Sequence, residues 1–212
     1  MKNILIILSV LINTYAIEIK QMPIDFTENR IELTKQYIEN SYGFKVENIN
    51  IVPEIIVIHH TATDDLEDSY KRFKPELLLS DRKYIKKAGN LNVSAHFLVD
   101  FDGTIYSMMP ETYMGRHIIG LNYSSIGIEN VGGNKKMLTK EQLKANIELV
   151  KYLKEKYKTI KYLIGHYEYT KFERHPLFLE KDAKYRTVKH DPDKIFMESL
   201  KENFSDLKSY ER

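Results

Sequence analysis

The chain has 212 residues, which suits one domain large enough to fold without covalent cross-links. It contains no cysteine, and this excludes disulfides, thiolate metal ligands, a cysteine nucleophile and a lipid-bearing N-terminal cysteine. Charged residues make up 29% of the sequence but the net charge is only +2, so the two signs nearly balance. A nucleic acid as the main partner would require a concentrated basic face, and this composition argues against one.

The N-terminus has the pattern of a secretory signal peptide. Lys2 supplies a positive charge, residues 4–12 are apolar apart from one serine, and Thr14 and Ala16 stand at the −3 and −1 positions of a cleavage site. The apolar stretch is shorter than the ~20 residues that cross a bilayer. We therefore expect a signal peptide at 1–16, a mature domain at 17–212 without a membrane span, and a periplasmic or secreted location. The alternative is that the apolar stretch forms a buried N-terminal strand or helix.

Turn residues and the spacing of apolar side chains predict the elements of the mature domain. In the first half of the chain they are a helix from Thr27 to about Asn40, a buried strand at Glu54–His60, and a helical segment from Asp64 to about Arg82 that is interrupted by Pro75. Two strands follow at Val93–Phe101 and Thr104–Met109, joined by an Asp102-Gly103 hairpin turn. The remaining elements are a strand at Ser125–Val131, a helix from Thr139, a strand at Thr159–Gly165 and a final helix capped by Asp191 or Asp193. Thr139 and Gln142 have the spacing of a capping box. Strands and helices alternate, which predicts an α/β fold: a single domain with a mixed central β-sheet flanked by helices.

Histidines stand at the ends of two of these strands. His59 and His60 close the strand Glu54–His60, and His166 directly follows the strand Thr159–Gly165. Neighbouring side chains on a strand point to opposite faces, so only one of His59 and His60 can face a given metal ion. A strand end is stiff, as a metal site requires, but a single histidine there is more often a core residue than a ligand.

A carboxylate follows in the sequence Lys189-His190-Asp191-Pro192. The residue before a proline is biased to an extended backbone, which fixes the direction of the Asp191 carboxylate. Two histidines and one carboxylate are a common ligand set for catalytic zinc, with the fourth position left to water. The competing interpretation of Asp191 is a helix N-cap, a frequent role of aspartate.

Two further residues are candidates for acid–base chemistry. Glu129 lies inside the apolar strand Ser125–Val131, where a carboxylate needs a partner or a raised pKa. It is either a glutamate in a salt bridge at a sheet edge or a general base for an attacking water. In an extended chain Lys189 leaves the backbone on the same side as Asp191, so it could stabilise an oxyanion; otherwise it is a solvated surface lysine.

Six segments together resemble, in this order, the zinc-dependent N-acetylmuramoyl-L-alanine amidases of type 2. That family includes phage lysozyme-type amidases, anhydromuramyl-peptide amidases and peptidoglycan recognition proteins. The segments are Val57–Thr63, Ser94–Val99, Asp102–Ile105, Asn122 with Ser125–Glu129, Gly165-His166 and Lys189–Pro192. The resemblance covers about residues 50–205 and implies a mixed sheet with flanking helices and a zinc ion in a surface groove.

Carried over by position, the resemblance assigns roles to ten residues. It implies that one zinc ion per chain is held by His59, His166 and Asp191. It implies a catalytic glutamate at Glu129 and a catalytic lysine at Lys189. The substrate groove would be lined by His117, Arg116 and Asn122, and the site would be supported from behind by His60 and His96. Some members use a tyrosine where this chain has Ala95, so the resemblance implies the glutamate mechanism.

One segment departs from the family pattern. Many members have a much shorter connection between the second histidine and the aspartate than residues 167–188, which are rich in aromatic and charged side chains. This insert contains His175 and Asp182, two rival third ligands. We favour Asp191 because it alone has the Lys-x-Asp-Pro context, and we expect the insert to form one wall of the groove.

The sequence thus predicts a zinc hydrolase that cleaves the amide between the lactyl group of N-acetylmuramic acid and L-alanine. Its substrate would be peptidoglycan or a muropeptide, the 1,6-anhydro form included. The main alternative is a recognition protein of the same fold that binds muropeptides without cleaving them. An unrelated zinc peptidase is disfavoured because the sequence has no His-Glu-x-x-His motif.

Overall fold

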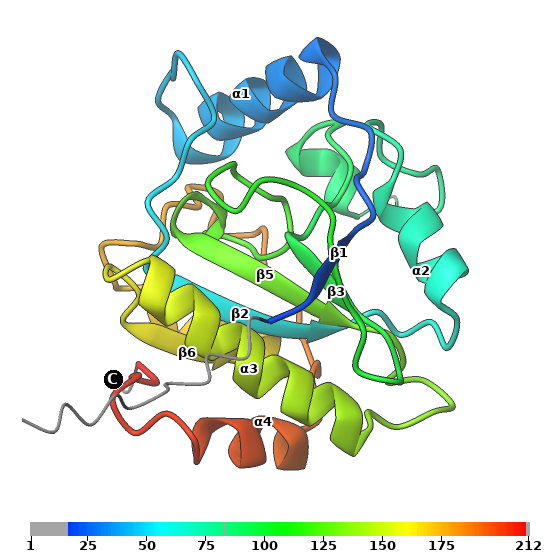
Figure 1. Ribbon diagram of the computed structural model, residues 1–212. Helices are drawn as coiled ribbons and strands as arrows, with labels where there is room; N and C mark the ends of the chain where they lie inside the picture. Colours follow the sequence, from blue (N-terminus) through cyan, green and yellow to red (C-terminus); the bar gives the residue numbers. More distant parts are fainter. Residues whose placement is uncertain (1–16, 83, 211–212) are drawn as a thin grey trace, which may run out of the picture.

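The computed structural model describes residues 17–82 and 84–210, in which six strands form one mixed sheet (Figure 1). The strands are β1 (Ile19–Gln21), β2 (Ile55–His60), β3 (Phe97–Val99), β4 (Ile105–Ser107), β5 (Ser125–Asn130) and β6 (Tyr162–Gly165). Their spatial order is β1-β4-β3-β5-β2-β6. β3 and β4 are antiparallel, and the other neighbouring pairs are parallel. The predicted α/β fold is therefore confirmed.

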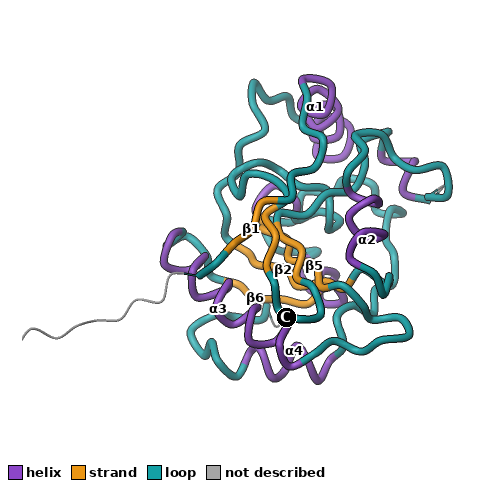
Figure 2. The backbone as a smooth tube through the Cα atoms, turned by 45° about the vertical axis from the view of Figure 1, so that its right-hand side comes forward, coloured by secondary structure: helices purple, strands orange, loops and turns teal. Residues whose placement is uncertain are grey.

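The helices lie on both sides of this sheet (Figures 1 and 2). They are α1 (Glu28–Tyr42), α2 (Leu66–Phe73), α3 (Lys140–Lys156) and α4 (Lys194–Lys201), with short 3-10 helices η1 (Ile85–Ala88), η2 (Asn122–Ser124) and η3 (His166–Phe172). α3 and α4 cover one face, where Leu149 and Met197 pack in one apolar cluster with Ile56 and Ile58. The other face packs against irregular segments and the 167–188 insert, through Ile55.

The alternation of side chains along β2 places one series of residues against α3 and α4 and the other series, which includes His59, on the opposite face of the sheet. Ile56 and Ile58 face α3 and α4, whereas Ile55 and Val57 face the opposite side. His59 continues the second series, so it points away from α3 and α4. In the parallel pairing of β2 with β5, His59 lies opposite Glu129, which therefore leaves the sheet on the same face.

Local sequence signals locate the N-terminal caps of α1 and α3 correctly. The Thr27 side chain caps α1 by accepting the Asn29 N–H, and Gly43 ends that helix in the left-handed conformation (φ 76°). Thr139 and Gln142 form the predicted capping box of α3. α4 is capped by Asp193, whose carboxylate accepts two backbone N–H groups. Of the two predicted caps for this helix, the structure thus has Asp193.

The segment predicted as helical from Asp64 to about Arg82 is helical only in α2. Lys74, the last residue before Pro75, still has a helical conformation, but Pro75 has no N–H to continue the helix. The buried Arg30 guanidinium donates to the carbonyls of Phe73, Lys74 and Pro75, which a longer helix would use for its own hydrogen bonds. Strands β3 and β4 are also shorter than predicted, and β1 has no counterpart among the predicted elements. β1 is three residues long and exists through its parallel pairing with β4.

The predicted signal peptide at 1–16 lies outside the described residues. Within the part of the chain that is described, no helix has the length and apolar character needed to cross a membrane.

Polar side chains of α3 tie that helix to the carboxyl ends of the strands. Gln142 Nε2 donates to the carbonyls of Val99 and Val131, at 3.1 and 2.9 Å. Asn146 Nδ2 donates to Asn130 Oδ1 at 2.7 Å, and Asn130 Nδ2 donates to the His59 carbonyl at 3.0 Å. The backbone at the end of β2 is therefore fixed by a buried network that begins on α3.

Replacement of Gln142 by Ala should destabilise the fold strongly for a single polar residue. The change removes one half of the capping box and the side-chain donor to the carbonyls of Val99 and Val131, of which Val99 keeps only the Val131 N–H, so we expect a loss of about 1–3 kcal/mol in the free energy of unfolding. Urea denaturation measures this. The matched control is Gln36→Ala, at an exposed position of α1, with an expected change within about 0.5 kcal/mol. Equal effects of the two substitutions would contradict this view of Gln142.

Candidate metal centre and active site

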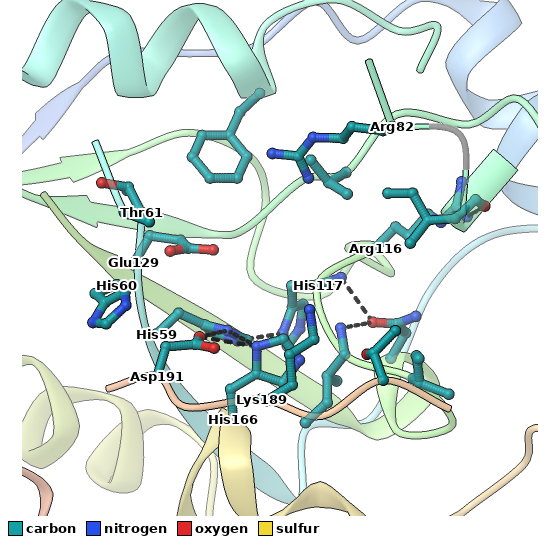
Figure 3. Close-up of a pocket in the computed structure, with 18 of the residues that line it drawn as sticks. His59, His60, Thr61, Arg82, Arg116, His117, Glu129, His166, Lys189 and Asp191 are labelled. Atoms are coloured by element: carbon teal, nitrogen blue, oxygen red, sulfur yellow. Dashed lines mark hydrogen bonds and ion pairs between the residues drawn. The ribbon is translucent and has the colours of Figure 1, made fainter. Parts of the chain in front are cut away.

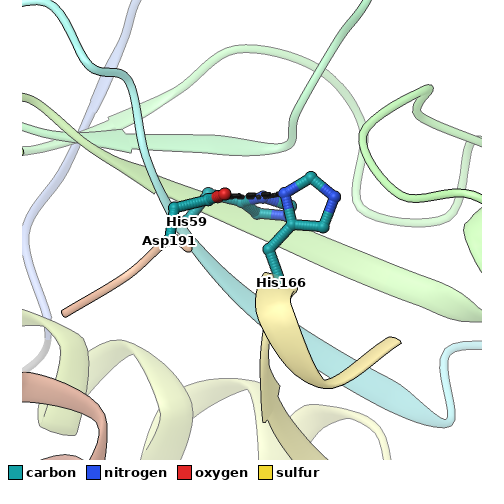
Figure 4. Close-up of side chains that lie close together, drawn as sticks. All are labelled: His59, His166 and Asp191. Carbon is teal, nitrogen blue, oxygen red and sulfur yellow. Dashed lines mark hydrogen bonds and ion pairs between the residues drawn. The ribbon is translucent and has the colours of Figure 1, made fainter. Parts of the chain in front are cut away.

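Three side chains from separate parts of the chain meet at one edge of the sheet (Figure 4). His59 is the last residue but one of β2, His166 follows the neighbouring strand β6, and Asp191 comes from the segment before α4. His166 Nδ1 lies 2.9 Å from His59 Nδ1 and 2.9 Å from Asp191 Oδ2, and His59 Nδ1 lies 3.3 Å from the same carboxylate oxygen. The two histidines are buried, at 1% and 6% exposure.

The hydrogen-bond partners around His59 allow a tautomer in which its Nδ1 is free for a metal ion. His59 Nε2 lies 3.0 Å from His117 Nδ1, and His117 Nε2 lies 3.2 Å from Ser125 Oγ. A consistent assignment of protons has His59 Nε2–H donating to His117 Nδ1, and His117 Nε2–H donating to Ser125. In this neutral tautomer the lone pair of His59 Nδ1 points to His166 and Asp191.

The three converging atoms fit a cation. Two imidazole lone pairs and a carboxylate oxygen repel one another at these distances unless a cation, or a proton on one ring nitrogen, lies between them. Burial lowers the pKa of His166 to about 4 and lowers the pKa of His117 well below its ordinary value, so protonation is not the favoured source of that charge at neutral pH. Neutral imidazoles with one carboxylate are donors that suit zinc.

The Asp191 carboxylate is held in its charged form. Burial alone would raise its pKa, but the neighbouring His166 and His59 outweigh this effect and hold the pKa well below the usual range. Because Asp193 caps α4, the carboxylate of Asp191 is not engaged at that helix terminus. Of the two interpretations of Asp191, the structure therefore agrees with a position beside the histidines and not with the cap of α4.

Glu129 lies beside this cluster and lines the same pocket (Figure 3). It is 8% exposed, and its Oε2 has no hydrogen-bond partner among the described residues. Burial raises the pKa of Glu129 to about 7, with opposing contributions from His59 and Asp191. A carboxyl group with such a pKa can both accept and donate a proton near neutral pH. The alternative of a salt bridge at a sheet edge does not describe this residue, because β5 is an interior strand and Glu129 forms no ion pair within residues 17–82 and 84–210.

Lys189 lines the pocket next to the histidine cluster. It is half-buried and carries no ion pair with any residue that the structure describes. Its positive charge is close enough to lower the pKa of both Glu129 and His166. The pocket thus holds an acid–base group and a free ammonium around the candidate metal site.

The three residues expected along the substrate groove also line the pocket, but their polar atoms mainly contact protein. His117 binds His59, as described above. Asn122 Oδ1 accepts the N–H groups of His117 and Ile118, at 2.9 and 2.8 Å. The Arg116 guanidinium donates to carbonyls of the loop around η1, those of Ile85, Gly89 and Leu91. These contacts favour a role in holding loops in place, and substrate binding by the three residues stays a prediction.

The two histidines expected behind the ligands occupy different environments. His96 is fully buried, accepts the Gly127 N–H at Nδ1 and donates from Nε2 to the Tyr113 carbonyl, and burial lowers its pKa to about 4. Its ring packs against His117 with centroids 5.8 Å apart. His60 leaves β2 on the other face, and its buried Nδ1 has no partner among the described residues. His96 therefore braces the loop that holds His117.

The insert contributes to the pocket without supplying the rival ligands. His175 packs in an aromatic cluster, with Nε2 3.1 Å from the Tyr162 hydroxyl, and Asp182 accepts the Lys184 N–H in a turn. Neither belongs to the metal-ligand cluster found in the described residues. Tyr185 and Thr187 line the pocket, in agreement with a wall formed by this segment.

Arg82 also lines the pocket and was not singled out by its sequence. It lies in an irregular segment with no motif and no strand or helix period. The one sequence signal for Arg82 is that an arginine follows the end of a helix in a segment without regular structure.

Comparison with known proteins agrees with this geometry. The model of the family described as N-acetylmuramoyl-L-alanine amidase matches residues 50–193. The chain is 34% identical over 80 residues to the endolysin of Enterobacteria phage T3, in a match that covers 38% of this chain and 48% of the endolysin. The chain thus spans about half the length of this curated relative.

Solved structures share the fold. N-acetylmuramoyl-L-alanine amidase LysC from Clostridium intestinale URNW superposes with a TM-score of 0.54 at 23% identity, over 91% of this chain and 100% of that chain. Bumblebee PGRP-SA superposes with a TM-score of 0.52 at 21% identity, over 79% of this chain and 93% of that chain. At these identities the two structures establish the fold alone. The family match, in contrast, covers most of the sequence and runs from before His59 to beyond Asp191, and the chain therefore belongs to the N-acetylmuramoyl-L-alanine amidase family.

Proposed function

We propose that this protein is a zinc-dependent amidase that hydrolyses the bond between N-acetylmuramic acid and L-alanine in peptidoglycan or muropeptides. The observation that carries the proposal is the buried cluster of His59, His166 and Asp191 with Glu129 on the same face of the sheet. The family match and the similarity to a phage endolysin support it.

The ligands would be His59 Nδ1, His166 Nδ1 and the Asp191 carboxylate. A zinc ion held by them would supply Lewis-acid chemistry, activating water and polarising the scissile carbonyl. The chain of His59, His117 and Ser125 keeps the proton of His59 on Nε2 and thereby orients the ring.

Proton transfer is assigned to Glu129. Its carboxylate takes a proton from the water that attacks the carbonyl carbon, and the resulting acid passes that proton to the leaving nitrogen of L-alanine. The pKa of about 7 suits both directions of transfer. The Lys189 ammonium, which has no ion-pair partner among the described residues, donates to the oxyanion that develops on the carbonyl oxygen.

The main alternative is a protein that binds muropeptides without cleaving them. A binding role would not require Glu129 to be kept buried without a partner, nor Lys189 to be free beside a metal site. The direct test is to incubate the protein with purified sacculi and with reducing and 1,6-anhydro muropeptides, and to identify the products by mass spectrometry. Released stem peptides with a free L-alanine amino group support the amidase, whereas bound but intact muropeptides would identify a recognition protein.

Export is part of the proposal. The predicted leader at 1–16 should be removed after Ala16, which places the enzyme in the compartment of its substrate. Mass spectrometry of the protein isolated from its own cells should find an N-terminus at Ile17. Detection of the chain with Met1 intact would contradict export by a cleaved leader.

Metal content should depend on three residues and not on their rivals in the insert. His59→Ala, His166→Ala and Asp191→Ala should each bind little zinc after dialysis, where the unmodified protein binds one equivalent, because each removes one of three converging donors. His175→Ala and Asp182→Ala are the matched controls and should keep their zinc. Elemental analysis gives the metal content and circular dichroism checks the fold. Full zinc in Asp191→Ala together with loss of zinc in Asp182→Ala would reverse the assignment.

Glu129 and Lys189 should affect turnover without affecting metal binding. Glu129→Gln keeps the shape of the side chain and should lower kcat by about 10²- to 10⁴-fold, as general-base loss does. Lys189→Met should lower it by about 10²- to 10³-fold. Because both groups act on one transition state, the double variant should lose less than the product of the two effects.

The controls for this experiment are Glu202→Gln and Lys140→Met, which change exposed residues of the same types. Zinc analysis and muropeptide cleavage are measured on the same samples. Near-normal turnover of zinc-loaded Glu129→Gln would remove Glu129 from the mechanism.

A further inference from the structure

Residues 187–191 bring the chain back to the site at the end of the long insert. Their side chains alternate between the pocket and solvent. Thr187, Lys189 and Asp191 line the pocket, whereas Val188 is 83% exposed and His190 is also exposed (Figure 3). A displacement of this backbone therefore moves the Lys189 ammonium relative to the candidate metal ligands.

The middle of this segment has no backbone support of its own. It lies between the insert and α4, outside any strand or helix. The backbone of residues 188–190 forms no hydrogen bond within the part of the chain that the structure describes. At the far end of the segment, the Tyr167 N–H donates to the Asp191 carbonyl at 3.1 Å. The position of Lys189 thus depends on how the two ends of the segment are held.

The near end is held by the hydroxyl group of one side chain, that of Tyr169 in η3. This hydroxyl accepts the Thr187 N–H at 2.8 Å and donates to the Thr187 carbonyl at 2.7 Å. One side chain therefore satisfies both backbone polar groups of Thr187, as a neighbouring strand does in an antiparallel sheet.

Tyr169 is itself fixed by the core. Its side chain is fully buried and packs with Ile55 and Val57 of β2 and with Ile164 of β6. Residues three apart lie above one another in a 3-10 helix, and the Tyr169 ring accordingly lies beside His166, with ring centroids 5.9 Å apart. The hydroxyl thus connects the segment of Lys189 to the same rigid part of the sheet that positions His59 and His166.

We propose that Tyr169 is a positioning residue for Lys189: its hydroxyl fixes the segment that carries the ammonium and so sets where that charge lies beside the candidate metal ligands. The inference rests on the proposed amidase function and deepens it, since it names the contact that returns the chain to the site after the insert. Tyr169 does not line the pocket, so its effect on the reaction passes through Lys189.

The test uses Tyr169→Phe, which keeps the ring and removes the hydroxyl. We expect kcat for muropeptide cleavage to fall by about 10- to 100-fold, less than in Lys189→Met, with KM and bound zinc nearly unchanged. The loss should disappear when Tyr169→Phe is combined with Lys189→Met, because no ammonium is left to misplace. An equal loss with and without Lys189, or a loss of zinc, would overturn the assignment, because Tyr169 would then act through the fold or through His166.

The matched control is Tyr162→Phe. It also removes a tyrosine hydroxyl that holds the insert, since this hydroxyl lies 3.1 Å from Nε2 of His175, but it leaves the contacts of residues 187–191 in place. We expect its kcat to stay near that of the unmodified protein. A loss in Tyr162→Phe as large as that in Tyr169→Phe would contradict the proposal, because any loosening of the insert would then be sufficient.

A measurement of backbone motion separates this inference from the proposed function. Nuclear magnetic resonance order parameters of Val188, Lys189 and His190 require no turnover. In Tyr169→Phe they should fall from the range of ordered backbone, about 0.85, towards the flexible range below about 0.6. If no muropeptide is cleaved but the order parameters fall in this way, the amidase function fails and the anchoring of Lys189 by Tyr169 stands. If cleavage proceeds and Tyr169→Phe changes neither kcat nor the order parameters, the role of Tyr169 fails and the amidase function stands.

Discussion

Two imidazole nitrogens and one carboxylate oxygen converge behind the pocket, and the rest of the site depends on how their close approach is accommodated. Nδ1 of His59 and Nδ1 of His166 lie 2.9 Å apart, so a proton on one ring nitrogen or a cation must lie between their lone pairs. The surrounding structure disfavours a charged His166 ring. Burial lowers the pKa of His166 to about 4. The second ring nitrogen of His59, Nε2, lies 3.0 Å from His117 Nδ1. A divalent cation satisfies all three groups at once.

The arrangement of these groups depends on the two faces of the sheet. On β2 one series of side chains packs against α3 and α4, and the other series ends in His59. The register with β5 places Glu129 opposite His59, so a buried glutamate and a buried histidine emerge side by side without any loop being involved. The network from Gln142 and Asn146 then holds the strand ends from the helical side. The rigidity of the candidate metal site therefore results from contacts within the buried core.

Irregular segments supply the rest of the pocket. Lys189 comes from the segment before α4, Tyr185 and Thr187 come from the insert, and Arg82 comes from the segment between α2 and β3. These segments are held to each other by the Tyr84 contacts and not by the sheet. The candidate metal ligands His59 and His166 thus depend on the sheet, whereas this part of the pocket lining depends on contacts between irregular segments.

The sequence by itself determined the α/β class, the N-terminal caps of α1 and α3, and the residue types of the site. These features depend on caps, turn residues and side-chain periods, which act over a few neighbouring residues. Tertiary structure alone decided that Asp193 caps α4 while Asp191 meets His166, that the helix after Asp64 stops at Phe73, and that β1 joins β4. It also brought Arg82 into the pocket. Each of these outcomes depends on contacts between residues far apart in the chain, and local propensity carries no information about which distant partner a side chain meets.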